Sequence, residues 1–260
     1  MEKNKKAVLS LSGGMDSTSL LMHLLSKNYE VHCLSFNYGQ KHKYELEKAK
    51  SLTTFLKERN FNVSHKIIDI SSIQDILISS LTSSNIEIPE GSYNEKDMKS
   101  TVVPNRNKIF SSIIQACAIS ISDGSETFIS LGVHAGDHDV YPDTTLDFIE
   151  DDFKAFNTGN WNTDNIHLYM PYIKLDKGQV LKDGVKSCEK LGLDYKEVYI
   201  NSFTSYNPIS IDGKTYSDYK TASSIERIAA FKSNNLIDPI PYADQDGLKD
   251  WEFVKNSTSN

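Results

Sequence analysis

The chain has 260 residues, of which 38% are hydrophobic and 24% are charged, and its formal net charge is −7. This length suits one large α/β domain with an appendage, and the composition excludes a disordered chain and a membrane-spanning one. The acidic charge argues against a nucleic acid as a partner of the whole surface, and the N-terminus lacks the apolar segment of a signal peptide, so a cytoplasmic globular protein is expected.

The first predicted element is a buried strand over residues 6–11, whose apolar run ends at Ser12-Gly13-Gly14. Leucines at helical spacing follow within residues 15–25, so the two glycines stand between a strand and a helix N-terminus. Such a junction gathers free backbone N–H groups and the positive end of the helix dipole, and glycine lets an anion approach the backbone. The pattern predicts a phosphate-binding loop, although a Gly-Gly turn alone also suits a plain connection.

The next elements complete a parallel half-domain. A second buried strand is predicted over residues 29–36, a helix opens within residues 37–46 and runs to about residue 60, and residues 63–70 alternate as a third strand. Strands and helices in this order favour a right-handed parallel α/β unit. Its ligands are expected outside the carboxyl ends of the strands.

The middle of the chain begins with a polar stretch. Residues 71–101 are predicted to form an insertion or lid with a short helix at residues 73–83. A helix over residues 108–122 follows Pro104, which can only precede it or occupy its first turn. Residues 127–131 then read as a fourth strand, which ends in the polar loop of residues 132–143.

The last third contains fewer strands. It is predicted to hold a helix over residues 146–157, a short strand over 166–169, a helix over 176–191 and a helical segment near 217–233. The alternation predicts a Rossmann-like doubly wound parallel sheet in residues 1–192. Residues 193–260 would form a small C-terminal helical appendage.

The loop after the first strand resembles the pyrophosphate loop of the ATP pyrophosphatases. With further motifs added, the chain resembles the 7-cyano-7-deazaguanine synthase family from about residue 8 to residue 242. The motifs are Ser12-Gly13-Gly14-Met15-Asp16-Ser17, Tyr38-Gly39-Gln40-Lys41-His42, Val103-Pro104-Asn105-Arg106-Asn107, Gly132-Val133-His134, Asp139 with Tyr141-Pro142-Asp143, and Pro171 with Leu175-Asp176-Lys177. The resemblance implies a fold of the adenine nucleotide alpha hydrolase type. It also implies an enzyme that uses ATP to turn the carboxylate of 7-carboxy-7-deazaguanine into an amide and then a nitrile, releasing AMP and pyrophosphate.

ATP and Mg²⁺ are the cofactors that this resemblance implies. Backbone N–H groups of the glycines would hold the pyrophosphate, and Asp16 would hold magnesium. The predicted nucleotide-binding residues are Ser10, Ser12, Gly13, Gly14, Met15, Asp16, Ser17, Leu34, Phe36, Arg106 and Gly132. Helix capping is the alternative for Asp16 and Ser17, and core packing is the alternative for Leu34 and Phe36.

The predicted catalytic residues are Asp16, Lys41, His42, Arg106 and Lys177. Arg106 precedes a helix, and its planar guanidinium can bind the α-phosphate or the substrate carboxylate through two hydrogen bonds. Lys41 and His42 could reach the same groups from a helix start, and Lys177 could stabilise the adenylate. An ordinary solvated charge is the alternative for these last three.

The predicted substrate-binding residues are Tyr38, Gln40, Asn107, His134, Asp139, Tyr141, Pro142 and Asp143. The carboxylate of Asp139 or Asp143 would accept hydrogen bonds from the amino group and ring N–H of a guanine-like edge. Tyr141 or Phe36 would stack on the ring. A polar surface loop is the alternative for this stretch, and helix capping is the alternative for Asn107.

Members of the family carry a zinc site of four cysteines near the C-terminus, and this chain departs from that pattern. Aligned on Arg227 and Phe231, the four positions become Ser205, Asp218, Thr221 and Ser224. Hydroxyl groups bind zinc weakly, so zinc is not expected. The cysteines that remain, Cys33, Cys117 and Cys188, lie far apart and read as buried reduced thiols. The tail is expected to be held by packing of Tyr216, Tyr219, Ile225, Ile228 and Phe231.

The sequence does not decide which amine accepts the activated carboxylate. Ammonia would give a free small molecule, whereas an amine of a partner protein would give a conjugate, as in diverged relatives associated with anti-phage defence. A tRNA-modifying enzyme with the same loop and a nucleotide-binding pseudoenzyme are further alternatives. A homodimer is expected, because the family tends to pair.

Overall fold

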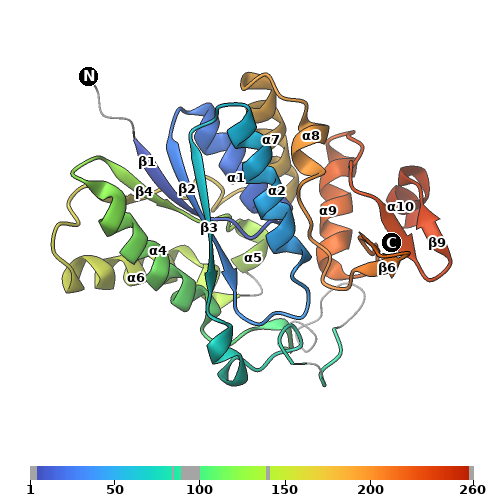
Figure 1. The fold of residues 1–260 in the computed structure, drawn as a ribbon, viewed down its shortest axis with the longest axis horizontal. Helices are drawn as coiled ribbons and strands as arrows, with labels where there is room; N and C mark the ends of the chain where they lie inside the picture. Colours follow the sequence, from blue (N-terminus) through green and yellow to red (C-terminus); the bar gives the residue numbers. More distant parts are fainter. Residues whose placement is uncertain (1–4, 84, 89–99, 139–140, 258–260) are drawn as a thin grey trace.

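A five-stranded parallel sheet in the order β3-β2-β1-β4-β5 forms the centre of the molecule (Figure 1). The computed structural model describes residues 5–83, 85–88, 100–138 and 141–257. The strands are β1 (Lys6–Ser10), β2 (Glu30–Asn37), β3 (Val63–Asp69), β4 (Thr127–Ser130) and β5 (Ile166–Leu168). This order confirms the predicted doubly wound fold, whose two halves run outward from neighbouring β1 and β4.

Helices cover both faces of the sheet (Figure 1). One face carries α1 (Met15–Ser26), α2 (Tyr44–Glu58) and α7 (Lys177–Lys190), and the other carries α4 (Arg106–Ser122) and α6 (Leu146–Gly159). Successive side chains of a strand point to opposite faces, so Ala7 and Leu9 pack with the first group and Val8 with the second. This two-sided burial explains the continuous apolar run of β1.

The insertion after β3 contains less helix than predicted. Instead of a helix over residues 73–83, a 3₁₀ helix, η1 (Ser71–Ile76), is followed by a turn. In this turn the Ser79 N–H donates to the Thr82 hydroxyl at 3.0 Å, and that hydroxyl donates to the Leu77 carbonyl. Such bonds between side chains and backbone compete with helix formation, which accounts for the wrong prediction. Residues 89–99 of the predicted insertion lie outside the described residues.

The polar loop after β4 contains two short turns of helix, α5 (Ala135–His138) and η2 (Pro142–Thr144). Both lie at the carboxyl end of the sheet, where the loop was predicted. No helix among residues 5–83, 85–88, 100–138 and 141–257 is long and apolar enough to span a membrane.

The tail after residue 192 contains helices, as predicted, together with two short hairpins. It contains α8 (Tyr195–Tyr199), a hairpin of β6 (Ile209–Ile211) and β7 (Lys214–Tyr216), α9 (Ala222–Ser233), a second hairpin of β8 (Tyr242–Asp244) and β9 (Gly247–Lys249), and α10 (Trp251–Ser257). The helix predicted from residue 217 begins at Ala222. Ser217 forms a β-bridge with Tyr242 instead, so its backbone is not available to a helix.

A buried ion pair holds parts of the tail to one another. The Arg227 guanidinium on α9 donates to both carboxylate oxygens of Asp238, at 2.6 and 2.9 Å, and to the Ser202 hydroxyl at 2.9 Å. Both charged side chains are fully enclosed. Of the five residues predicted to pack the tail, Ile228 and Phe231 are buried, and the other three are partly buried. Polar contacts therefore add to the predicted packing.

Candidate active site

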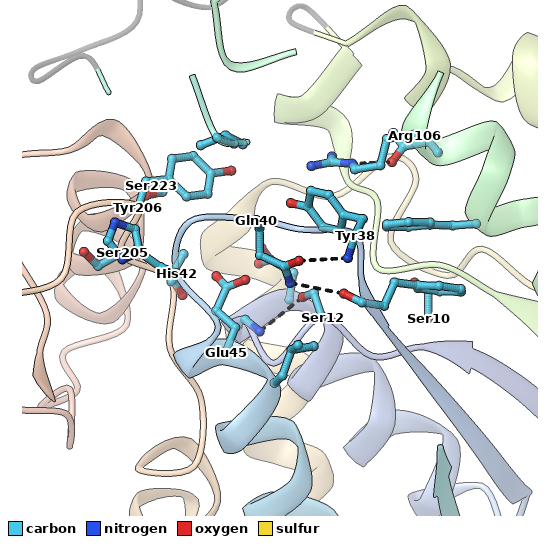
Figure 2. Close-up of a pocket in the computed structure, with 18 of the residues that line it drawn as sticks. Ser10, Ser12, Tyr38, Gln40, His42, Glu45, Arg106, Ser205, Tyr206 and Ser223 are labelled. Atoms are coloured by element: carbon cyan, nitrogen blue, oxygen red, sulfur yellow. Dashed lines mark hydrogen bonds between the residues drawn. The ribbon is translucent and has the colours of Figure 1, made fainter. Parts of the chain in front are cut away.

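A cavity of about 300 Å³ opens at the carboxyl ends of β1 and β2 (Figure 2). Ser12 reaches it from the loop after β1, Tyr38 from the segment after β2, and Arg106 from the start of α4. The tail forms another side of the cavity, with Tyr206 pointing inward. Open α/β sheets bind their ligands at this edge, next to the point where the strand order reverses.

The loop after β1 has a shape that only glycine allows. Gly13 has φ +92°, and a Cβ added there would lie 2.1 Å from the carbonyl oxygen of Glu45. Gly14 is the N-cap of α1, and its N–H donates to the Ser12 hydroxyl at 3.1 Å. The Ser12 and Ser17 hydroxyls lie 3.0 Å apart. The positive end of α1 therefore faces the cavity, as an anion site requires.

Asp16 in the first turn of α1 has an incomplete set of partners. Its Oδ2 lies 3.5 Å from Lys177 Nζ and 3.9 Å from His134 Nε2, and Lys177 also pairs with Glu226 at 2.8 Å. Its Oδ1 is buried and has no hydrogen-bond partner among the described residues. Since an unsatisfied buried carboxylate oxygen is costly, this atom fits a cation such as Mg²⁺ that would complete the site.

Aromatic rings form the wall opposite the loop. Phe36 at the end of β2 stacks on Phe110 of α4, with ring centroids 4.0 Å apart and planes at 7°. The Arg106 guanidinium lies 5.9 Å from the Tyr38 ring centroid. Gln40 folds back on its own strand, because its amide accepts from the Tyr38 N–H and donates to the Phe36 carbonyl. The cavity thus combines the N-terminus of α1 with a flat apolar wall and an arginine.

Comparisons with known proteins agree with this geometry. The model of the family described as queuosine biosynthesis protein QueC matches residues 6–234. The chain belongs to this family. The 7-cyano-7-deazaguanine synthase 1 of Colwellia psychrerythraea is 40% identical over 238 residues, which are 92% of this chain and 99% of that protein. The 7-cyano-7-deazaguanine synthase of Methanoregula boonei is 40% identical over 237 residues, 91% of this chain and 99% of that protein.

Most residues that the QueC family resemblance predicted for the site line this cavity. They are Ser10, Ser12, Gly14, Asp16, Phe36, Tyr38, Gln40, Lys41, His42, Arg106, Asn107, Tyr141 and Lys177. They come from both halves of the sheet and from the start of α7, so the fold gathers motifs that are up to 167 positions apart, from Ser10 to Lys177. Their functional roles remain predictions.

The other predicted residues are placed beside the cavity or away from it. Gly13 shapes the loop, Met15, Ser17 and Leu34 are buried, and Gly132 packs against the backbone of Ser17. His134 is buried next to Asp16, and Pro142 opens the short helix η2. Asp143 lines a separate cavity of about 20 Å³ between α4 and α6. Asp139, the other predicted reader of the base, lies outside the described residues.

Several residues of the cavity wall were not predicted. Glu45 follows the Tyr38–His42 motif by three positions, and Phe110 lies on the helix that Arg106 begins. Tyr206 and Glu226 come from the tail. Glu45 could have been found by extending its motif into the helix. The tail residues gave no such signal, because long-range packing decides which side of the tail faces the cavity.

The four positions aligned with the zinc cysteines of QueC proteins do converge in space. Asp218 accepts hydrogen bonds from the hydroxyls of Ser205, Thr221 and Ser224, and from the backbone N–H groups of Lys220 and Thr221. A carboxylate with five donors has no lone pair left for a metal, and the hydroxyls point their hydrogens at it, so these residues do not fit zinc. The absence of zinc from the protein stays a prediction.

Proposed function

We propose that the protein transfers AMP from ATP to the carboxylate of 7-carboxy-7-deazaguanine and then passes the acyl group to an amine. The observation that carries this proposal is the cavity, which is lined by the loop before α1, by Asp16 with its unpaired oxygen and by Arg106. The names of the relatives support a deazaguanine as the substrate. Activation is needed because a free carboxylate has no leaving group that an amine can displace.

The loop side of the cavity is assigned to the phosphates of ATP. The N-terminus of α1, with the Ser12 hydroxyl, would hold the pyrophosphate as it departs. Mg²⁺ bound at Asp16 would neutralise part of the charge on the phosphates. Lys177, held by Asp16 and Glu226, would add positive charge at the same side.

The wall opposite the loop is assigned to the carboxylate substrate. Arg106 would orient the carboxylate through two parallel hydrogen bonds, and the Phe36–Phe110 pair would support a flat ring. One carboxylate oxygen would attack the α-phosphorus of ATP, and the bond to the β-phosphate oxygen would break, so that pyrophosphate leaves with the electron pair. The product of this step is an acyl-adenylate.

Ammonia is the proposed acceptor, because the two 7-cyano-7-deazaguanine synthases named above match this chain over 99% of their length. The Asp218 cluster in place of four cysteines is the one feature that favours a protein amine as the second candidate. Intact-mass spectra of proteins incubated with the enzyme, ATP and the carboxylate would separate the two. A mass increase on a protein would favour the second candidate, and a free amide or nitrile the first.

The shared first step is tested by AMP release in the presence of Mg²⁺, ATP and 7-carboxy-7-deazaguanine. Asp16→Ala is expected to lower AMP release by about a hundredfold or more, because the Mg²⁺ that would neutralise charge in the transition state loses a ligand. Asp151→Ala, an exposed position on α6, is the matched control and should leave the rate unchanged. Equal rates for Asp16→Ala and the wild type would contradict the role of Asp16.

A further inference from the structure

The Glu45 carboxylate lines the cavity that holds the predicted phosphate and substrate walls. Glu45 is the second residue of α2, and its backbone is fixed by the close approach of Gly13. Figure 2 shows its side chain pointing into the cavity. The same cavity is lined by Ser12 of the loop and by Arg106. An acyl-adenylate spanning the two walls would therefore pass close to this carboxylate.

Glu45 differs from the other acidic residues that line the cavity. Asp16 and Glu226 both pair with Lys177. The Glu45 carboxylate has no hydrogen bond and no ion pair within the described part of the chain, although the charge of Arg106 acts on it from a distance. The Glu45 side chain is half-buried, and a carboxyl group withdrawn from water without a partner is stabilised by gaining a proton or a cation.

The protonation behaviour of Glu45 suits proton transfer near neutral pH. Burial raises the pKa of Glu45 to about 8, and the positive charge of Arg106 opposes part of this rise. His42 lines the same cavity, but burial and the neighbouring Lys41 lower its pKa, which makes it the weaker base of the two. A general base works best when its pKa lies near the working pH.

We propose that Glu45 is the catalytic base that takes a proton from the ammonium acceptor, an inference that rests on the proposed function. Ammonium has no lone pair, so it must lose a proton before it can attack. The carboxylate can first attract the cation and then accept that proton. In this reading Glu45 serves the second half-reaction, whereas Asp16 and Arg106 serve the first.

Proton transfer precedes acyl transfer in this step. One proton passes from ammonium to the Glu45 carboxylate, and the freed lone pair of nitrogen forms a bond to the acyl carbon. The bond between that carbon and the phosphate oxygen breaks, and AMP leaves with the electron pair. A second proton then leaves the nitrogen for water, which gives the neutral amide. No other co-reactant is needed.

The test separates the two half-reactions in Glu45→Gln, which keeps the shape of the side chain and cannot take the proton. Exchange of labelled pyrophosphate into ATP, dependent on 7-carboxy-7-deazaguanine, measures the first half-reaction. Amide formation from ammonium chloride measures the second. We expect exchange within about threefold of the wild type and amide formation lowered by about a hundredfold or more, as for a lost general base.

Two further readouts distinguish a base from a structural residue. The wild-type rate of amide formation should rise with pH and level off at about 8, following the pKa of Glu45. Glu45→Gln can use only free ammonia, so its lower rate should keep rising with pH beyond that point. Hydroxylamine, which is uncharged at neutral pH and needs no deprotonation, should restore product formation in the variant. Glu47→Gln, an exposed position on the same helix, is the matched control.

Each remaining outcome has a definite meaning. Wild-type amide rates in Glu45→Gln would overturn the role of Glu45 and leave the proposed function intact. Loss of exchange together with amide formation would also overturn it, because the assigned role is confined to the second step. No exchange in the wild type would instead refute the proposed function. Exchange without amide from ammonium in the wild type would overturn the ammonium acceptor and this inference with it.

Discussion

At the scale of single residues, the loop glycine offers the sharpest test. Gly13 combines a positive φ with a contact that a Cβ would make at 2.1 Å to the Glu45 carbonyl oxygen. Gly13→Ala should therefore displace the loop from α2, and the KM for ATP is expected to rise at least about tenfold, since misplaced binding groups are costly to catalysis. Steady-state kinetics of AMP release would measure this change.

Gly192→Ala is the matched control for the loop glycine. Gly192 also has a positive φ, of +73°, but no atom lies within 4 Å of an added Cβ. Its replacement should cost roughly 1–2 kcal/mol of stability from backbone strain alone and leave the KM unchanged. If both variants kept a wild-type KM for ATP, the close fit between the loop and α2 would have no role in binding.

Site residues that belong to short sequence motifs could be predicted from the sequence, because the neighbouring residues make each motif recognisable. The loop residues, Tyr38 and Arg106 are of this kind, and the fold brings all of them to one cavity. Extending the Tyr38–His42 motif would have placed Glu45 in the site but would not have revealed the protonation behaviour of this residue. Its character depends on burial and on the distance to Arg106, which only the assembled structure provides.

At the scale of elements, the Asp218 cluster is expected to hold the loop before β6 against α9 without a metal. Asp218→Ala would leave three hydroxyls and two backbone N–H groups without their acceptor. Unsatisfied buried groups cost about 1–3 kcal/mol each, so we expect a loss of about 3 kcal/mol or more in urea unfolding. Asp246→Ala, exposed in the β8–β9 turn, should change stability by less than about 0.5 kcal/mol.

The same cluster predicts how the protein responds to chelators. The unfolding temperature should be the same before and after treatment with EDTA, and elemental analysis should find no stoichiometric zinc. Zinc at one equivalent per chain, with a lower unfolding temperature after its removal, would show that the cluster is not the organising centre of this region.

Elements whose apolar pattern is local could be predicted, α9 of the tail included, whereas the two hairpins of the tail could not. β1 is a nearly continuous apolar run, because helices cover both faces of the sheet there, and β3 alternates between polar and apolar residues. The strands of the tail hairpins have only three residues each, too short for a pattern to emerge. Asp212-Gly213, both at positive φ, was the one available signal for the first hairpin, since this pair favours a tight turn.

At the scale of the whole molecule, the Arg227–Asp238 pair holds together the tail, which lines one side of the cavity. Arg227→Met would leave the enclosed Asp238 carboxylate without its cation. Removing one partner of a buried ion pair costs about 3–5 kcal/mol, and the free energy of unfolding in urea should fall by this amount. Because Tyr206 and Glu226 of the tail line the cavity, we also expect a higher KM for ATP at temperatures where the variant is folded.

A double-mutant cycle separates the pair from its surroundings. In Arg227→Met/Asp238→Leu no unpaired charge remains, although Tyr242 and Ser202 lose hydrogen-bond partners. The double variant should therefore lose less stability than the sum of the two single variants, by about 2–3 kcal/mol. Strict additivity would mean that the two charges do not act as a pair. If the double variant is more stable than Arg227→Met and also has a lower KM for ATP, the packing of the tail affects the shape of the cavity.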